Sequence, residues 1–133
     1  MDWKLIISTF AVALLLFAWA GVVYGALMKN YFAREFGHLF RPPQEFKLGG
    51  QVMENLLQGL FLSLLYRRVI PFSLLPALNG LAFGALVGAL LGATHLFSTW
   101  VNYRTSFLPV LVTAAFGYAR MLAAGVLLGV ILR

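Results

Sequence analysis

Charged residues divide this chain into long apolar stretches. The first uncharged stretch runs from Leu5 to Met28, and the last, from Thr105 to Leu132, is interrupted only by Arg120. A helix needs about 20 mostly apolar residues to cross the roughly 30 Å hydrocarbon core of a bilayer. The pattern therefore predicts an all-α integral membrane protein, a single domain over residues 1–133 with four transmembrane helices in a compact bundle. Their expected ranges are 3–27, 50–70, 77–100 and 107–132.

Two of these helices have features that complicate the prediction. The second contains Glu54 and ends at the pair Arg67–Arg68, so it is the least apolar. The first has an alternative as a cleaved signal peptide, because the segment 18–20 (Ala-Trp-Ala) resembles a cleavage site. The apolar stretch continues past that segment without a polar region before it, which favours an uncleaved helix. None of the stretches alternates in the manner of membrane β-strands, so a barrel is not expected.

The segment 30–41 is expected to form an amphipathic helix that lies in the membrane interface. Its apolar residues recur at helical spacing and share one face, while its charged residues lie mostly on the other. The apolar face consists of Phe32, Phe36, Leu39 and Phe40, and the polar face of Arg34, Glu35, His38 and Arg41. An irregular loop is the alternative.

Composition supports the membrane assignment. The chain is 62% hydrophobic and only 11% charged, whereas soluble domains carry about 25% charged residues. A soluble single domain and a disordered chain are both excluded. The formal charge of +6 is spread over turns and helix ends, which favours anionic lipid headgroups as partners and argues against nucleic acid. The absence of cysteine excludes disulfides and thiolate sites.

The distribution of positive residues gives a weak indication of orientation. Four crossings place both termini and the Arg67–Arg68 turn on one side, with four positive residues, and the long loop 28–49 on the other, with five. Positive residues favour the cytoplasm, so we expect the long loop inside and the termini outside, in a bacterial inner membrane. Insertion in both orientations stays open.

Glycines at four-residue spacing form the sharpest pattern. Such a glycine zipper gives a helix a smooth ridge that a second backbone can approach closely, which drives helix association in lipid. The expected helix-packing face consists of Gly80, Gly84, Gly88 and Gly92 in the third helix, Gly21 and Gly25 in the first, and Gly125 and Gly129 in the fourth. Packing within the bundle is favoured. A docking face for another subunit or a second copy is the main alternative, and a glycine-lined pore is a minor one.

Polar residues within the predicted helices are the remaining candidates, because such groups are costly in lipid and often functional. They are Glu54, Asn55, Gln58, His95 and Arg120. Counting along the helices places Glu54 and His95 at similar depth, near the long loop. They are expected to form a buried tie between two helices, with a proton relay or ligand site, or simple wetting at the interface, as alternatives.

Arg120 lies thirteen residues from Phe107 and thirteen from Arg133, in the middle of the fourth helix. By helix rise Glu54 is roughly 15 Å nearer the long-loop side, so no acidic residue is expected at the depth of Arg120. Contacts with carbonyl groups and waters inside the bundle are one way to compensate its charge. An anionic group from a partner subunit, a lipid or a substrate is the other.

No catalytic, cofactor or metal site is predicted. Zinc usually needs three or more protein ligands, and His95 and Glu54 provide only two within the helices. The sequence contains no nucleophile–base pair, no P-loop and no dinucleotide-binding fingerprint. We therefore do not expect an enzyme.

The glycine-rich third helix, the short turn Asn102–Ser106 and the motif Phe116-Gly117-Tyr118 carry a family resemblance. With the segment 20–26 (Ala-Gly-Val-Val-Tyr-Gly-Ala) at the end of the first helix, and Gly125 and Gly129 in the last, the chain resembles the bacterial membrane family called Domain of Unknown Function 1761. The resemblance implies a small four-helix protein. It implies no activity and no catalytic residues.

Two functions follow from a chain rich in helix-packing surface and poor in chemistry. The favoured one is an accessory or assembly subunit that packs against a larger membrane protein complex. The alternative is a small homo-oligomeric transporter or channel that uses Glu54, His95 and Arg120. Small multidrug-resistance exporters are similar in size, but they carry a glutamate deep in the first helix, where this chain has none.

Overall fold

The computed structural model describes residues 2–37, 47–69, 75–102, 104 and 106–133, and most of them are helical. The described part contains no strand, so the all-α prediction is confirmed. The elements in chain order are α1 (Trp3–Val22), the π-helix η1 (Val23–Leu27), α2 (Lys29–Phe36), α3 (Leu48–Arg68), α4 (Pro76–Asn102) and α5 (Phe107–Ile131). The Asp2 side chain caps α1 by accepting a hydrogen bond from the Leu5 amide at 3.3 Å. Pro76 is the first residue of α4, a position where proline is favoured because the backbone amide of that residue has no partner within the helix.

Three helices are long and apolar enough to cross a membrane: Trp3–Leu27, Pro76–Asn102 and Phe107–Ile131. The predicted second crossing exists as the 21-residue helix α3, but it is not one of the three. The reason lies in its composition, since α3 carries polar and charged side chains near both ends. The predicted helix is therefore present, while its crossing of the membrane stays a prediction.

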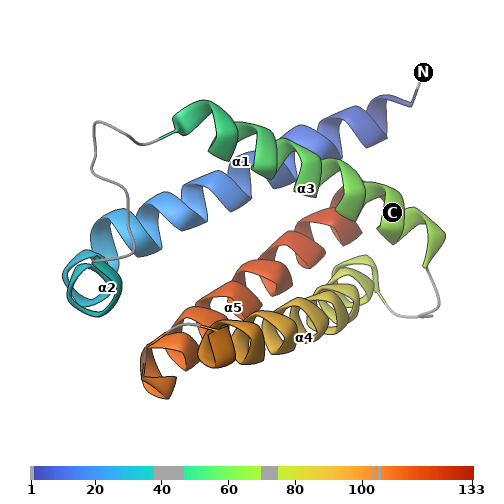
Figure 1. Ribbon diagram of the computed structural model, residues 1–133. Coiled ribbons are helices and arrows are strands. Elements are labelled where there is room, and N and C mark those ends of the chain that lie inside the picture. The colour runs from blue at the N-terminus through green and yellow to red at the C-terminus, as the bar shows by residue number, and fades with distance from the viewer. Residues whose placement is uncertain (1, 38–46, 70–74, 103, 105) are drawn as a thin grey trace.

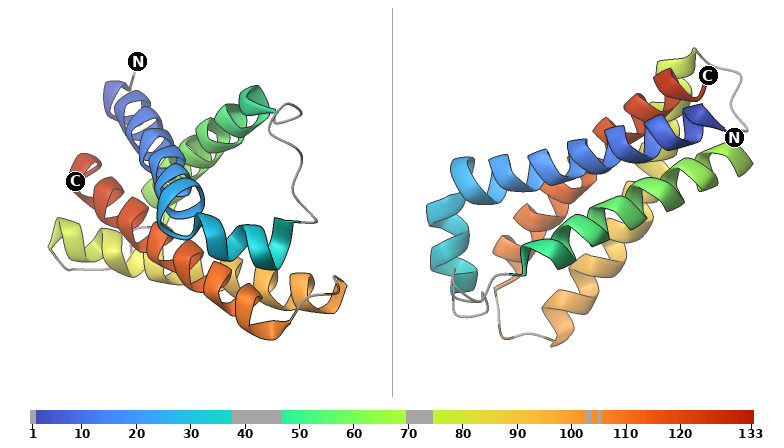
Figure 2. Two further views of the ribbon diagram at one scale, coloured as in Figure 1. Left: turned by 90° about the vertical axis from the view of Figure 1, so that its left-hand side faces the viewer. Right: turned by 90° about the horizontal axis from the view of Figure 1, so that it is seen from above.

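The four long helices form two hairpins that cross (Figures 1 and 2). α1 packs along α3, α4 packs along α5, and the hairpins meet mainly where α1 contacts α5. The backbones of α3 and α4 stay apart, although the rings of Tyr66 and Phe83 meet edge to face with centroids 5.2 Å apart. Both chain ends lie at the same end of the molecule (Figure 1), where the Lys4 ammonium is 3.4 Å from the Arg133 carbonyl oxygen.

An ion pair between Asp2 and Arg67 ties the start of α1 to the end of α3. The Arg67 guanidinium holds the pKa of the Asp2 carboxyl below its usual value, helped by the Leu5 amide.

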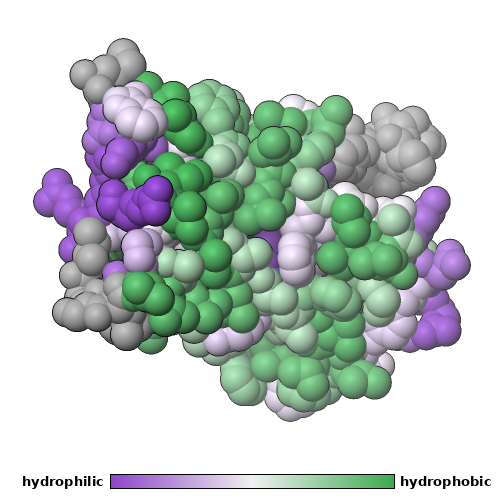
Figure 3. All heavy atoms as spheres, turned by 180° about the vertical axis from the view of Figure 1, so that it is seen from behind, coloured by the Kyte–Doolittle hydropathy of each residue, from purple (hydrophilic) through white to green (hydrophobic). Residues whose placement is uncertain are grey.

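The main core lies where the hairpins cross. All four long helices contribute to it, through Val12, Leu16, Leu62, Tyr66, Phe83, Met121, Ala124 and Leu128. Large apolar side chains also cover the outer faces of the helices, and Figure 3 shows them as a band between hydrophilic residues at two opposite ends of the molecule. Exposed apolar surface of this extent marks contact with lipid or protein, as expected of a membrane protein.

A short helix, α2, covers part of the segment 30–41 that is predicted to form an interfacial helix. Its residues Phe32, which is 1% exposed, and Phe36 pack with Val23 and Val110. These two members of the predicted apolar face are therefore covered by protein. Leu39, Phe40, His38 and Arg41 lie outside the described residues, and the position of α2 in a membrane interface stays a prediction.

Candidate functional site

Arg120 joins three helices where the hairpins cross. Its Nη2 donates one hydrogen bond to the Leu16 carbonyl oxygen of α1, at 3.0 Å, and another to Oδ1 of Asn55 in α3, at 2.7 Å. A guanidinium donates in a fixed planar fork, so these two acceptors fix its position between the hairpins. Arg120 is therefore the polar link between α5 and both helices of the other hairpin.

Asn55 is oriented for this contact by its own helix. Its side chain is buried, at 3% exposure, and its Nδ2 donates to the Gln51 carbonyl oxygen one turn earlier, at 3.0 Å. That bond uses the donor end of the amide, which leaves Oδ1 to face Arg120. The sequence placed Asn55 and Arg120 within the membrane but did not pair them.

Both hydrogen bonds of Arg120 go to neutral oxygen atoms. Among the described residues Arg120 makes no ion pair, while its Nε is buried without a hydrogen-bond partner. Glu54 and Tyr24 lie near enough to interact electrostatically with it. Inserting an arginine at the centre of a membrane helix costs about 2.5–3.5 kcal/mol on insertion scales. The two hydrogen bonds to neutral oxygens leave the charge of Arg120 without a counterion.

Two more buried polar atoms lack partners in the described part of the chain, on the two helices that hold Arg120. They are Nε1 of Trp19, three residues after Leu16, and Oε1 of Gln58, three residues after Asn55. Buried polar groups are normally paired. With Nε of Arg120, three buried polar atoms on α1, α3 and α5 therefore lack a hydrogen-bond partner within the described part of the chain.

The structure does not bring Glu54 and His95 together. Glu54 is exposed on α3, and His95 is exposed on α4, where its Nδ1 lies 3.5 Å from the Thr99 hydroxyl of the same helix. Their helices belong to different hairpins with separated backbones. The expected tie between these two residues is therefore not formed.

The estimated depth difference between Glu54 and Arg120 also needs correction. Counting along parallel helices separates them by roughly 15 Å, yet Asn55, the residue next to Glu54, lies 2.7 Å from Arg120. The hairpins cross at an angle (Figure 2), so equal counts along two helices do not give equal depth.

The glycine ridge of α4 packs against α5. A Cβ added at Gly80 would overlap the Gly125 carbonyl oxygen, and one added at Gly84 would overlap that of Met121. Gly125 and Gly129 meet α4 in the same way, and Gly88 faces the Tyr118 ring. These contacts lie within one chain.

The remaining glycines of the predicted packing face do not contact another helix closely. A Cβ at Gly92, Gly21 or Gly25 would meet nothing within 4 Å. Gly59, which the spacing pattern did not include, makes the close approach of α3 to α1, because a Cβ there would overlap the Thr9 carbonyl oxygen. Buried Ser8 and Ser63 add a 3.0 Å hydrogen bond between the same two helices.

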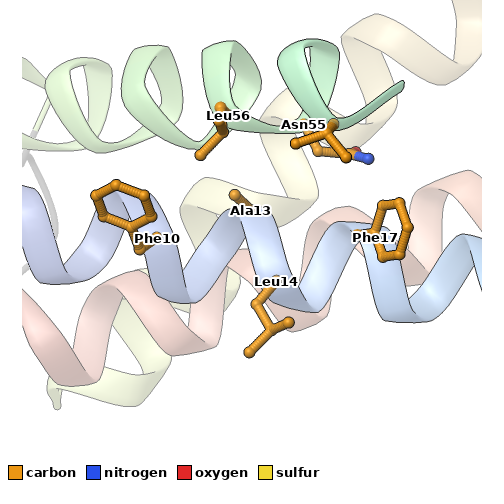
Figure 4. A pocket seen from close by; sticks show the side chains of 7 residues that line it. Phe10, Ala13, Leu14, Phe17, Asn55 and Leu56 are labelled. Atoms are coloured by element: carbon orange, nitrogen blue, oxygen red, sulfur yellow. The ribbon is translucent and has the colours of Figure 1, made fainter. Parts of the chain in front are cut away.

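A groove of about 320 Å³ lies between α1 and α3. Its lining is almost wholly apolar and comprises Phe10, Ala13, Leu14 and Phe17 of α1 with Val52, Asn55 and Leu56 of α3. Figure 4 shows Phe10 and Phe17 on either side of Ala13, opposite Leu56 and Asn55. The small Ala13 side chain opens this groove.

The described residues contain no group of three or more histidines and acidic residues that could hold a metal ion. In comparisons with known proteins, no family model, no curated protein and no solved structure matches this chain. The resemblance to Domain of Unknown Function 1761 thus stays a prediction.

Proposed function

We propose that this protein is an accessory or assembly subunit that packs its α1–α3 hairpin against a larger membrane protein complex. The observation that carries the proposal is the environment of α3. This helix has α1 as its only closely packed neighbour among the described elements, and it is also the least apolar of the four long helices.

The outer face of α3 combines large apolar side chains with an acidic one. Met53, Leu57 and Phe61 are all exposed there, and exposed Glu54 lies six residues into the helix, roughly 9 Å from its start. A carboxylate facing lipid is costly. Cover by a partner would shield Glu54 while it buries the apolar residues beside it.

The proposal includes a membrane topology. α3 crosses as the second of four helices, the long loop faces the cytoplasm, and the protein lies in a bacterial inner membrane. Two observations support four crossings: both chain ends lie at one end of the molecule, and α3 has the length of a spanning helix. The positive residues at the helix ends would contact anionic lipid headgroups.

A second candidate function is a small homo-oligomeric transporter or channel. The observation that favours it is the set of buried polar atoms without hydrogen-bond partners on α1, α3 and α5, which includes Nε of Arg120. Here a second copy, rather than a different subunit, would cover α3.

Purification from the native membrane in mild detergent separates the two functions. We expect a hetero-complex of defined composition, and Phe61→Ala should weaken it because Phe61 is 63% exposed on the outer face of α3. Leu90→Ala is the matched control, since Leu90 is 69% exposed on α4. A homo-oligomer alone, or equal effects of both substitutions, would argue against the accessory subunit.

A further inference from the structure

We infer that Arg120 is the binding site for a carboxylate that a partner carries on a transmembrane helix. This inference rests on the proposed function and specifies the chemistry of its partner. The carboxylate belongs to an aspartate or glutamate in an otherwise apolar helix.

The first argument is the charge balance at the crossing. Arg120 donates to two neutral oxygens, both from the same nitrogen, Nη2. Its Nη1 and Nε have no hydrogen-bond partner among the described residues. Nη2 already donates to two oxygens and Nε is buried, so Nη1 is the donor left for a carboxylate. A hydrogen bond between two ionised groups is stronger than one between neutral groups.

The second argument is access. Arg120 is partly exposed rather than sealed in the core. The backbones of α3 and α5 are not closely packed, so the guanidinium spans the space between these helices instead of lying in a tight helix contact. It is therefore open to a group from outside the chain.

The third argument is depth, which decides among sources of the anion. Arg120 lies thirteen residues from the start of α5 and eleven from its end, roughly 20 Å and 16 Å by helix rise. Lipid phosphates lie outside a hydrocarbon core about 30 Å thick, beyond the reach of this side chain. A side chain on a spanning helix can be placed at that depth.

Glu54 is the internal competitor, because it is the acidic residue that interacts electrostatically with Arg120. It forms no ion pair in the described part of the chain and is exposed. Asn55, next to it, occupies the position beside the guanidinium. An acid supplied from outside the chain is thus the remaining source.

The test uses a designed transmembrane peptide of leucine and alanine with a central aspartate, and the same peptide with leucine in its place. Binding to the full-length protein is measured by energy transfer in phosphatidylcholine vesicles, with the fluorophore on Asn30→Cys of this cysteine-free chain. We expect the aspartate peptide to bind about tenfold more tightly than the leucine peptide. Equal binding of the two peptides would overturn the inference.

Asn55→Asp is the decisive variant. It keeps the shape of the side chain and places a carboxylate against Arg120, so the site becomes neutral within the chain. We expect loss of the preference for the aspartate peptide. The matched control, Asn102→Asp, adds the same carboxylate at the exposed end of α4 and should keep the preference.

Three further arms complete the test. The preference should vanish in Arg120→Leu and survive in Glu54→Gln. If it appears only in Glu54→Gln, Glu54 is the partner of Arg120 and the inference fails. It also fails if phosphatidylglycerol vesicles or added inorganic phosphate abolish the preference, because the site then takes a headgroup or a free anion.

Failure of this inference is distinct from failure of the proposed function. A native hetero-complex that persists in both Arg120→Leu and Asn55→Asp would retain the accessory subunit and refute the carboxylate site. Absence of any hetero-complex would refute the function, while the peptide assay would still report on Arg120.

Discussion

Alanine substitutions at two glycines of α4 provide a direct test of the α4–α5 contact. Gly84 and Gly92 lie eight residues apart on one helix. A Cβ at Gly84 would overlap the Met121 carbonyl oxygen and lie 3.1 Å from Cα of Leu122, whereas a Cβ at Gly92 would meet nothing within 4 Å. The obstructing atoms at Gly84 belong to the backbone, so relief requires the helices to move apart.

Both substitutions gain the same helix propensity, about 0.5–1 kcal/mol for alanine over glycine. Gly84→Ala alone adds overpacking, which costs typically about 1–3 kcal/mol. We therefore expect Gly92→Ala to be neutral or stabilising, and Gly84→Ala to be less stable than Gly92→Ala by about 1–3 kcal/mol.

Unfolding in detergent, followed by circular dichroism, measures this difference. Because the two variants have the same composition, it isolates the contact with α5. Equal midpoints, or a less stable Gly92→Ala, would show that the helices do not approach each other at Gly84. Either result would refute the close contact between the glycine ridge of α4 and α5.

Three other predictions concern different parts of the chain. Reporters placed after Arg133 and at Gln44 should lie on opposite sides of the membrane; the same side for both would refute four crossings. Replacing Ser8 and Ser63 by alanine, singly and together, should give a coupling free energy of about 0.6 kcal/mol in a double-mutant cycle, the average for hydrogen bonds between membrane helices, and zero coupling would show that the bond contributes nothing. Because the pKa of Asp2 is lowered in the folded protein, its contribution to stability should be present above about pH 4, the ordinary aspartate range, and be lost on further acidification. Asp2→Asn should remove that pH dependence, and an unchanged acid profile would contradict it.

The sequence was sufficient to predict the helices, because long uncharged stretches have few alternatives. The expected range 107–132 and the observed α5 (Phe107–Ile131) agree within one residue. For α3, the expected start at residue 50 differs from the observed one at Leu48 by two residues. Helix ends follow from charges and prolines close to them in sequence, so local reasoning is adequate there.

The contacts between helices could not be predicted in the same way. The Asn55–Arg120 bond joins residues 65 positions apart and depends on the angle at which the hairpins cross. Counting along parallel helices misplaces that pair and wrongly favours Glu54 with His95. Gly59 was missed because the spacing pattern counted glycines alone. With Ser63 four residues later it forms a pair of small residues of the kind found at helix contacts in membranes, and it makes the close approach of α3 to α1.

The close glycine contacts between α4 and α5 also allow weak hydrogen bonds between the two backbones. At each close contact a Cα hydrogen occupies the position that a Cβ would take, so Cα–H of Gly80 faces the Gly125 carbonyl oxygen while Cα–H of Gly125 faces that of Gly80. Cα–H···O contacts of this kind contribute about 0.5–1 kcal/mol each. This polar attraction comes from the main chain and needs no difference in hydrophobicity between protein and solvent. The pairing of α4 with α5 should for that reason depend little on whether lipid or detergent surrounds it.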